Sequence, residues 1–322
     1  MGIQLRRFNP FISIVVPIFN EEENIDYFFS RMNKVLSQCS QKWEIIFIDD
    51  GSSDNGINLI KKLNAKNSNV RLIELSRNFG KEIALTAGLD LASGDVVIPI
   101  DADLQDPPEI IPQMIELWSE GFDVVLAQRS EREGETYIKK ATAKLFYKLI
   151  NKISDTSVPD NTGDFRLIDR KVLKSVNRLR ETRRFMKGLF SWVGYRQTFI
   201  TYKRDARFAG KTKWSYWKLW NFALEGVTSF STLPLRLATY FGVTVAFSSF
   251  LYLLFIVIET SVSGVNVPGY ASTLAVVLFL GGSILIFMGV IGEYLGRIYI
   301  EVKNRPIYIV KEKTGFVENN LI

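Results

Sequence analysis

The chain has 322 residues, of which 47% are hydrophobic, and a formal net charge of +6 from 40 Lys and Arg against 34 Asp and Glu. This composition excludes a disordered chain and fits one large or two modest folded domains. Cys39 is the single cysteine, which excludes an intramolecular disulfide and a multi-cysteine metal site. The chain has no histidine, so Ser-His-Asp catalysis, Cys-His catalysis and His-ligated zinc are excluded. Carboxylates, cations and hydroxyls remain for any chemistry.

The N-terminal part of the chain, residues 1–210, alternates between strand-like and helix-like segments. The strand-like runs are FISIVVPIF (11–19), WEIIFIDD (43–50), VRLIELS (70–76), DVVIPID (95–101) and FDVVLAQ (122–128). The segments Glu22–Gln38, Asn55–Asn67 and Gly80–Ala92 between them predict helices. Apolar runs that alternate with helices favour an α/β fold with a mostly parallel sheet, covered on both faces. Ligands of such sheets bind beyond the carboxyl ends of the strands.

The first apolar run is not the core of a signal peptide. It spans nine residues and stops at NEEEN, with no small-residue cleavage site. We therefore expect the N-terminus to belong to the first domain.

Polar clusters follow each predicted strand, and the fourth cluster, DADLQDPPE, is the richest in carboxylates. Asp101 and Asp103 lie two residues apart, so they project to the same side if the backbone stays extended, and Gln105 continues that row. Two carboxylates and an amide oxygen suit Mg²⁺ or Mn²⁺. A D-x-D pair alone is more often a solvated turn than a metal site. Its position after a buried parallel strand favours the metal site.

Asp106 and Glu109 have a separate, structural interpretation. The DPPE sequence places Asp106 before a proline with Glu109 three residues later, which predicts a capping box for a helix over Pro107–Glu120. Asp54 is expected to cap the helix over Asn55–Asn67 in a similar way.

Other strand ends carry groups suited to a nucleotide. Asp49 and Asp50 could accept hydrogen bonds from a base or a ribose, with an Asx turn as the alternative. Lys81 opens a predicted helix, where an anion meets both a helix N-terminus and a cation. Arg129, just past the fifth strand, could act in the same way.

Basic residues concentrate between residues 170 and 220, where 15 Lys or Arg face two acids. The last part of this basic stretch, KRDARFAGKTKWSYWKLW (203–220), contains three tryptophans at intervals of three residues. That spacing predicts one helical face that lies at a membrane interface, with core packing as the alternative.

Two long apolar runs follow and predict a transmembrane hairpin. Residues 237–258 and 260–292 contain no charge, and the second run is interrupted by a turn sequence at 263–270. A helix of 22 residues is about 33 Å long, enough to cross a bilayer core of about 30 Å. Lys and Arg flank the hairpin but are absent from its connection, so both ends are expected in the cytoplasm.

The second predicted span carries a small-residue pattern and a charge pair. Gly292 and Gly296 have a G-x-x-x-G spacing, with Gly289 on the same side, which predicts close helix packing within the hairpin or between protomers. We expect a homo-oligomer on this basis. Glu293 and Arg297 are spaced for an i, i+4 ion pair.

These elements divide the chain into four predicted parts. They are a cytoplasmic catalytic domain (1–210), an amphipathic juxtamembrane segment (211–234), two transmembrane helices (235–296) and a cytoplasmic tail (297–322). The protein is expected to be a multi-pass protein of the cell (inner) membrane.

Seven segments in this order resemble the family 2 glycosyltransferases with the GT-A fold. The segments are VVPIFNEEENI, IDDGSSD, SRNFGKEIALTAGLDLASGD, DADLQDPPE, DFRLIDR, RFAGKTKW and a hairpin that ends IGEYLGRIY. The resemblance covers nearly the whole chain and is strongest to polyisoprenyl-phosphate hexosyltransferases, the bactoprenol glucosyltransferases in particular.

The resemblance implies roles for individual residues. It implies nucleotide-sugar binding by Pro17, Phe19, Asn20, Glu21, Asp49, Asp50, Lys81, Asp101, Arg129 and Lys213. It implies metal binding by Asp101, Asp103 and Gln105, and contact with the acceptor phosphate by Lys139, Lys140, Arg207 and Lys211. Lys139 and Lys140 stand where relatives often carry arginine, and lysine lacks the bidentate fork. Asp103, Asp164 and Arg207 are the implied catalytic residues, with Asp164 either orienting the acceptor or acting as a base.

The implied activity is the transfer of a hexose, glucose first, from a UDP-sugar to a polyprenyl phosphate with inversion at the anomeric carbon. Mg²⁺ or Mn²⁺ is the expected cofactor, and the expected partners are the donor, the lipid acceptor and the membrane, without nucleic acid. Alternatives are a dolichol-phosphate-mannose-type or aminoarabinose-type transferase on the same acceptor, a processive polysaccharide synthase, and a non-catalytic nucleotide-sugar-binding scaffold. The Q-x-x-R-W motif of processive synthases is absent, the nearest stretch being ETRRFMKG.

Overall fold

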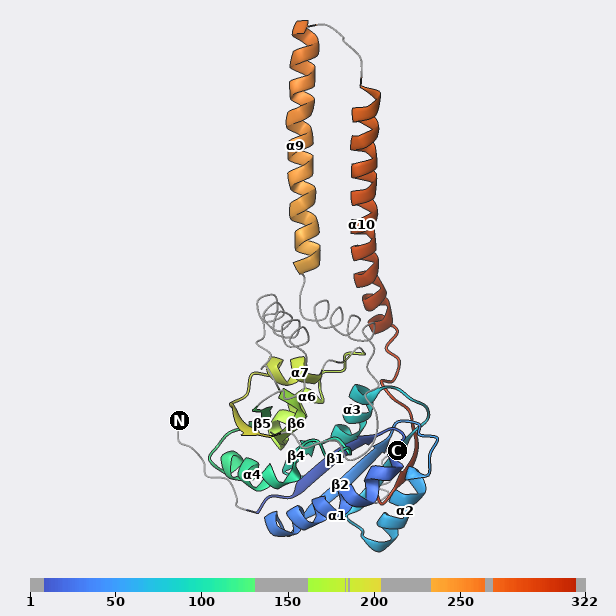
Figure 1. The fold of residues 1–322 in the computed structure, drawn as a ribbon, viewed down its shortest axis with the longest axis vertical. Helices are drawn as coiled ribbons and strands as arrows, with labels where there is room; N and C mark the ends of the chain where they lie inside the picture. Colours follow the sequence, from blue (N-terminus) through green and yellow to red (C-terminus); the bar gives the residue numbers. More distant parts are fainter. Residues whose placement is uncertain are drawn as a thin grey trace.

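The computed structural model describes residues 9–130, 162–182, 184, 186–203, 233–263 and 269–316. They form an α/β domain from which two long helices rise side by side (Figure 1). The strands are β1 (Ile12–Ile18), β2 (Trp43–Asp49), β3 (Val70–Leu75), β4 (Val96–Pro99), β5 (Val124–Arg129), β6 (Thr162–Asp169), β7 (Gln197–Tyr202) and β8 (Val310–Thr314). The helices are α1 (Glu22–Cys39), α2 (Gly56–Lys66), α3 (Lys81–Leu91), η1 (Pro108–Ile110), α4 (Ile111–Ser119), α6 (Arg170–Val176), α7 (Met186–Trp192), α9 (Leu233–Ser263) and α10 (Tyr270–Val302).

The eight strands form one sheet in the order β7-β5-β6-β4-β1-β2-β3-β8. The central strands β4, β1, β2 and β3 are parallel, β7 is parallel to β5, and β6 and β8 pair antiparallel with their neighbours. The predicted mostly parallel sheet is confirmed. All five strand-like runs became strands.

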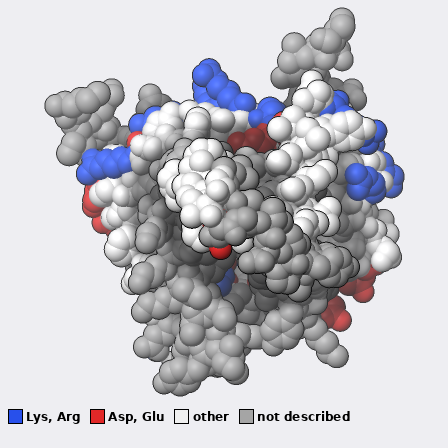
Figure 2. Space-filling model, turned by 90° about the horizontal axis from the view of Figure 1, so that it is seen from above, with Lys and Arg blue, Asp and Glu red and all other residues white. Residues whose placement is uncertain are grey.

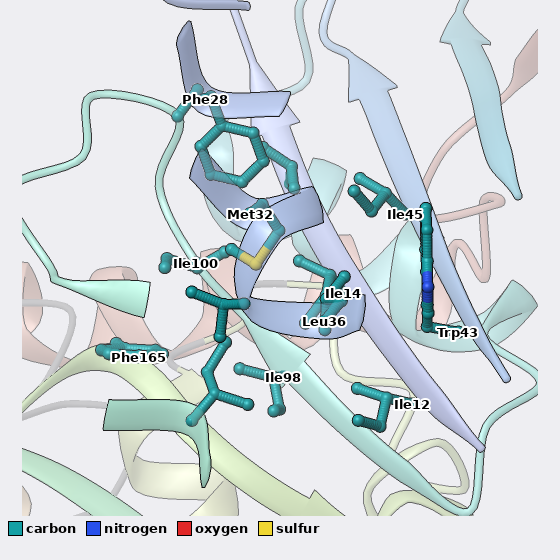
Figure 3. Close-up of a cluster of buried hydrophobic side chains, with 14 of the residues drawn as sticks. Ile12, Ile14, Phe28, Met32, Leu36, Trp43, Ile45, Ile98, Ile100 and Phe165 are labelled. Carbon is teal, nitrogen blue, oxygen red and sulfur yellow. The ribbon is translucent and has the colours of Figure 1, made fainter. Parts of the chain in front are cut away.

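The sheet is buried on both faces, as the continuous apolar runs predict. Successive residues of a strand point to opposite faces. Ile14 and Phe47 therefore pack against α1, whereas Val15 and Ile48 pack against α3. Figure 3 shows the first of these cores, in which Phe28 and Met32 of α1 lie over the strands. Helices α1 and α2 lie on the side of the sheet away from the hairpin, and α6 and α7 on the hairpin side (Figure 1).

The predicted helix over Pro107–Glu120 is present at nearly the same residues, but its predicted capping box was wrong. The structure has the 3₁₀ turn η1 followed by α4, and neither accepts a side-chain cap. Buried Asp106 instead accepts a hydrogen bond from the Tyr202 hydroxyl of β7, and Glu109 forms a bidentate pair with Arg31 of α1 at 2.7 Å. These partners are distant in sequence, so the local pattern could not reveal them. Asp54 does accept a hydrogen bond from the Gly56 amide at the start of α2, at 3.1 Å.

The segment after α10 returns to the α/β domain, which the sequence did not indicate. β8 pairs with the edge strand β3, and Tyr308 donates a hydrogen bond to Asp90 near the end of α3, at 2.9 Å. Glu301 at the end of α10 accepts a hydrogen bond from the Thr182 amide at 3.1 Å. Part of the predicted cytoplasmic tail is therefore built into the domain, and α10 is attached to it directly.

Among the described residues, one helical segment, Phe279–Val302 in α10, is long and apolar enough to cross a membrane. Ala238–Tyr252 in α9 is a shorter apolar stretch. The predicted Glu293–Arg297 pair is present, with 2.9 Å between Oε1 and Nη2. The glycines of α10 do not pack closely within the described hairpin, because a Cβ added at Gly292 or Gly296 would meet no atom within 4 Å.

Candidate active site

The carboxyl ends of β1, β2 and β4 meet at one edge of the sheet, where the loops that follow them are joined by hydrogen bonds. Asn20, in the left-handed region at φ 54°, accepts a hydrogen bond from the Ser53 amide at 2.8 Å. The Asn20 amide donates in return to the Ser52 hydroxyl at 2.9 Å. The loop after β1 is thus fixed to the loop after β2.

Asp49 and Asp50 are buried, and their carboxylates accept hydrogen bonds from the backbone amides of these loops. Asp49 accepts hydrogen bonds from the Gly51 and Ser52 amides, at 3.1 and 3.2 Å. Asp50 accepts from the Phe79 and Gly80 amides, at 2.7 and 2.9 Å, and so ties the end of β2 to the start of α3. Burial raises the pKa of both carboxyls above the usual value, because it outweighs the hydrogen bonds, which lower the pKa. Their predicted contact with a nucleotide stays a prediction.

Gly51 allows the close approach of two of these loops. Its φ is 75°, which favours glycine, and an added Cβ would lie 2.8 Å from the backbone of Arg77 and Asn78. No side chain fits there without moving the loop after β3.

The D-x-D segment turns sooner than predicted but still presents its polar side chains together. β4 ends at Pro99, Ala102 and Asp103 form a turn, and Leu104 has φ 53°, so the backbone does not stay extended through this segment. Ala102 and Leu104 are nevertheless buried, whereas Asp101, Asp103 and Gln105 are partly exposed. The two apolar side chains anchor the loop, so the three polar residues remain accessible.

Lys81 joins two carboxylates from neighbouring strands. Its Nζ lies 2.7 Å from Oδ1 of Asp101, after β4, and 2.7 Å from Oδ2 of Asp164, in β6. β6 runs antiparallel to β4, which brings the first part of β6 beside the end of β4. The exposed fractions of the Lys81, Asp101 and Asp164 side chains are 45%, 37% and 17%. This contact is the centre of the candidate site.

The charges of this cluster shift one another's pKa values. Burial raises the pKa of Asp164, but Lys81 and Lys187 outweigh it and hold this pKa well below its usual range. The pKa of Asp101 is raised by burial and by Asp164 and Asp103, against the effect of Lys81. Asp164 is therefore ionised at neutral pH.

Sequence reasoning missed three residues around this cluster: Glu82 of α3, Arg166 of β6 and Lys187 of α7. Glu82 accepts a hydrogen bond from the Met186 amide at 3.1 Å, which places the start of α7 beside α3. Buried Arg166 donates to the Gly163 carbonyl and lies 4.6 Å from the Phe190 ring centroid. All three stand within segments singled out above, SRNFGKE, DFRLIDR and RRFMKG. Their positions within these segments were the only sequence signal that could have identified them.

Glu82 predicts a pH-dependent stability. Burial and the Asp164 charge raise its pKa from 4.5 to about 7, so between these two pH values the folded state holds a proton that the unfolded state has released. The contribution of this protonated carboxyl group to the free energy of unfolding is therefore lost as the pH rises through this range. We expect the melting temperature of the wild type, relative to that of Glu82→Gln, to fall from pH 5 to pH 8. Thermal melts of both proteins across this range measure it. A difference that is constant or grows in favour of the wild type would contradict the assignment.

Arg129 lies at the end of β5, paired with Asp106. Its Nη2 is 3.6 Å from Oδ1 of Asp106, and its Nε donates to the Tyr202 hydroxyl at 3.2 Å. Of the other predicted residues, Pro17 lies in β1, Phe19 is 37% exposed just after it, and Glu21 accepts from the Asn24 side chain. The predicted Lys139, Lys140, Arg207, Lys211 and Lys213 lie outside the described residues.

The residues present fit a divalent ion with a particular ligand set. No group of three or more His, Cys, Asp or Glu among the described residues could hold a metal by itself. Mg²⁺ commonly uses one or two carboxylates and completes its shell with water and substrate phosphates. Asp101 and Asp103 supply such a pair, and Gln105 adds an amide oxygen.

Comparison with known proteins places this chain in a family. The family model described as Glycosyl transferase family 2 matches residues 13–176, which include the β1–β4 edge and Asp164. The chain is a member of glycosyl transferase family 2. It is a glycosyltransferase with a GT-A fold, as the sequence predicted. A second model, the GtrB C-terminal hairpin, matches residues 233–298 and so covers α9 and most of α10.

Individual relatives match this chain over almost its whole length. The chain is 53% identical to an uncharacterized glycosyltransferase of Synechocystis over 94% of this chain and 96% of the relative. It is also 53% identical to the SfII prophage-derived bactoprenol glucosyl transferase of Shigella flexneri, over 94% and 97%. A solved glucosyl-3-phosphoglycerate synthase from Mycobacterium tuberculosis, with Mn²⁺, UDP and glucosyl-3-phosphoglycerate, is 19% identical with a TM-score of 0.45 over 67% of this chain and 76% of that one. That likeness is too distant for conclusions about this chain.

Proposed function

We propose that this glycosyltransferase moves one hexose, glucose first, from a UDP-sugar to a polyprenyl phosphate at the cytoplasmic face of the membrane. The observation that carries the proposal is the 53% identity over 97% of a bactoprenol glucosyl transferase, hairpin included. The partly exposed carboxylates of Asp101 and Asp103 beyond β4 support it, because a nucleotide diphosphate needs such a site for its counterion.

The acceptor phosphate needs little activation by the protein. A phosphate monoester has a second pKa of about 6, by analogy with phosphoserine, so it is already a dianionic nucleophile at neutral pH. One of its oxygens attacks the anomeric carbon, the bond from that carbon to the diphosphate breaks, and UDP leaves with the electron pair. Attack opposite the leaving group inverts this carbon. A protein without histidine can therefore support the reaction.

The residues of the chain would then act mainly on the leaving group. Asp101, Asp103 and Gln105 would hold a divalent ion. When bound, that ion supplies positive charge to the diphosphate oxygens. We assign Asp164 to holding Lys81 in place, not to general base catalysis, because its lowered pKa makes it a weak proton acceptor. Arg129 and the predicted cations outside the described residues would contact the donor or acceptor phosphates.

The membrane placement belongs to the same proposal. Both hairpin helices would cross the bilayer, with the domain and both chain ends in the cytoplasm. Seen along the hairpin, the described domain carries Lys and Arg side chains at its rim, with Asp and Glu side chains between them (Figure 2). Lys303 and Arg305 are exposed directly after α10. Basic residues at the cytoplasmic end of a span match the positive-inside rule and attract anionic lipid. Assembly as a homo-oligomer stays a prediction.

The proposal is tested by transfer assays with the purified full-length chain. Radiolabelled UDP-glucose, GDP-mannose and a UDP-linked aminoarabinose are each offered with undecaprenyl phosphate in lipid vesicles, with Mg²⁺, Mn²⁺ or EDTA. We expect label in the lipid fraction from UDP-glucose, and its loss in EDTA. Transfer from another donor alone would overturn the choice of sugar, and transfer undiminished by EDTA would overturn the metal requirement.

A further inference from the structure

The ammonium of Lys81 contacts the same carboxylate, that of Asp101, that a bound metal ion would contact. Its ammonium lies 2.7 Å from Asp101, one of the two carboxylates assigned to the metal, and 2.8 Å separates Nζ from the second oxygen of the same carboxylate. Both Asp101 oxygens therefore face one cation. A divalent ion that took Asp101 as a ligand would meet the positive charge of the ammonium at the same carboxylate.

The structure also shows how Lys81 could leave Asp101 without losing its place in the site. Asp50 holds the amides of Phe79 and Gly80, so the backbone just before Lys81 is fixed. The side chain is 45% exposed, and a lysine has four flexible methylenes. Asp164 contacts the same ammonium from β6 and would retain it. The backbone is anchored while the charged end is free to exchange one partner.

We infer that Lys81 is a stand-in cation, which holds Asp101 in the empty enzyme and leaves it when a divalent ion arrives with the donor diphosphate. Lys81 is thus a positioning residue that couples metal binding to nucleotide binding. The inference rests on the proposed function, because it requires Asp101 to bind a metal.

The coupling follows from the partners available to the ammonium. A metal ion that binds alone takes Asp101 from Lys81 and offers nothing in exchange. A diphosphate that binds with the metal offers the ammonium new anionic oxygens. A neighbouring opposite charge changes the affinity of a carboxylate for a proton by about 10- to 1,000-fold, and the same electrostatics oppose a metal ion. The lysine should therefore weaken binding of the bare metal far more than binding of the metal with nucleotide.

The test is calorimetric titration of Mn²⁺ into the full-length protein in detergent, with and without UDP. Lys81→Met removes the charge at similar length, and Lys81→Arg retains it. We expect Lys81→Met to bind Mn²⁺ alone at least about tenfold more tightly than the wild type. The enhancement of Mn²⁺ affinity by UDP should shrink in this variant, whereas Lys81→Arg should behave like the wild type.

Lys171→Met is the matched control. Lys171 forms an ion pair of the same 2.7 Å length with Asp123, away from the carboxylates assigned to the metal. Its removal should change neither titration. Circular dichroism establishes that each variant is folded, and Lys81→Gln replaces Lys81→Met if the latter is not.

The outcomes separate this inference from the function on which it rests. If the wild type binds Mn²⁺ with UDP but the neutral variants show no gain for Mn²⁺ alone, the stand-in role is wrong and the proposed function stands. If no protein binds Mn²⁺ even with UDP, the metal assignment itself is wrong and the inference falls with it.

Discussion

Replacing Asp103 with alanine is expected to reduce hexose transfer to lipid by at least about 10²-fold, the scale for removing one preorganised electrostatic group. Asp103 would supply one of only two carboxylates to the metal, so the leaving diphosphate would lose most of its counterion. The side chain is partly exposed and lies in a loop anchored by the buried Ala102 and Leu104. The variant should therefore fold, and the loss should be one of activity.

The matched control is Asp95→Asn. Asp95 precedes the same strand β4 at its other end, is exposed, and accepts a hydrogen bond from the Phe11 amide at 2.9 Å. Radiolabel in the lipid extract is measured for both variants with saturating UDP-glucose and Mn²⁺. We expect near-normal transfer by Asp95→Asn. Undiminished transfer by Asp103→Ala would contradict the metal assignment.

A stop codon after Pro306 is expected to lower the free energy of unfolding of the catalytic domain by about 3 kcal/mol. The truncation removes Tyr308, Val310 and Phe316, which are partly buried against the core on the α3 side of the sheet. Each is assigned about 1 kcal/mol for partial burial of a large side chain. It also exposes the edge of β3 and removes the Lys61–Glu312 ion pair at 3.0 Å.

Such a loss corresponds to a fall in melting temperature of about 6–12 °C for a domain of this size. Intrinsic fluorescence of the protein in detergent reports the transition. The matched control is a stop after Phe316, which keeps β8 and its contacts and should melt like the full chain. Equal melting temperatures for the two truncated proteins would show that β8 does not stabilise the domain.

Most of the fold could be predicted from the sequence because its signals are local. The apolar runs that became β1 to β5 are continuous, and polar residues end each of them. The three strands β6, β7 and β8 were missed. β8 has the sequence VKEKT, without an apolar run, and becomes a strand only because the exposed edge of β3 is available to it. A strand of this kind is determined by its neighbour and not by its own composition.

The candidate site could be predicted as a set of residues but not as a set of contacts. The motifs identified Asp101, Asp103, Lys81 and Asp164 separately. The contact of Lys81 with both Asp101 and Asp164 depends on the antiparallel placement of β6 beside β4, which no local pattern indicates. Asp106 shows the converse. Its DPPE sequence is typical of a helix cap, but burial beside Tyr202 gives the carboxylate a different partner.

Mass spectrometry of the lipid product tests the central claim most directly. The full-length chain is incubated with UDP-glucose, Mn²⁺ and undecaprenyl phosphate in vesicles, and lipid and nucleotide products are measured together. We predict a lipid heavier than the acceptor by one hexose residue, formed in equal amount to the UDP released. UDP release without a modified lipid, or a lipid that carries a series of hexoses, would contradict the account.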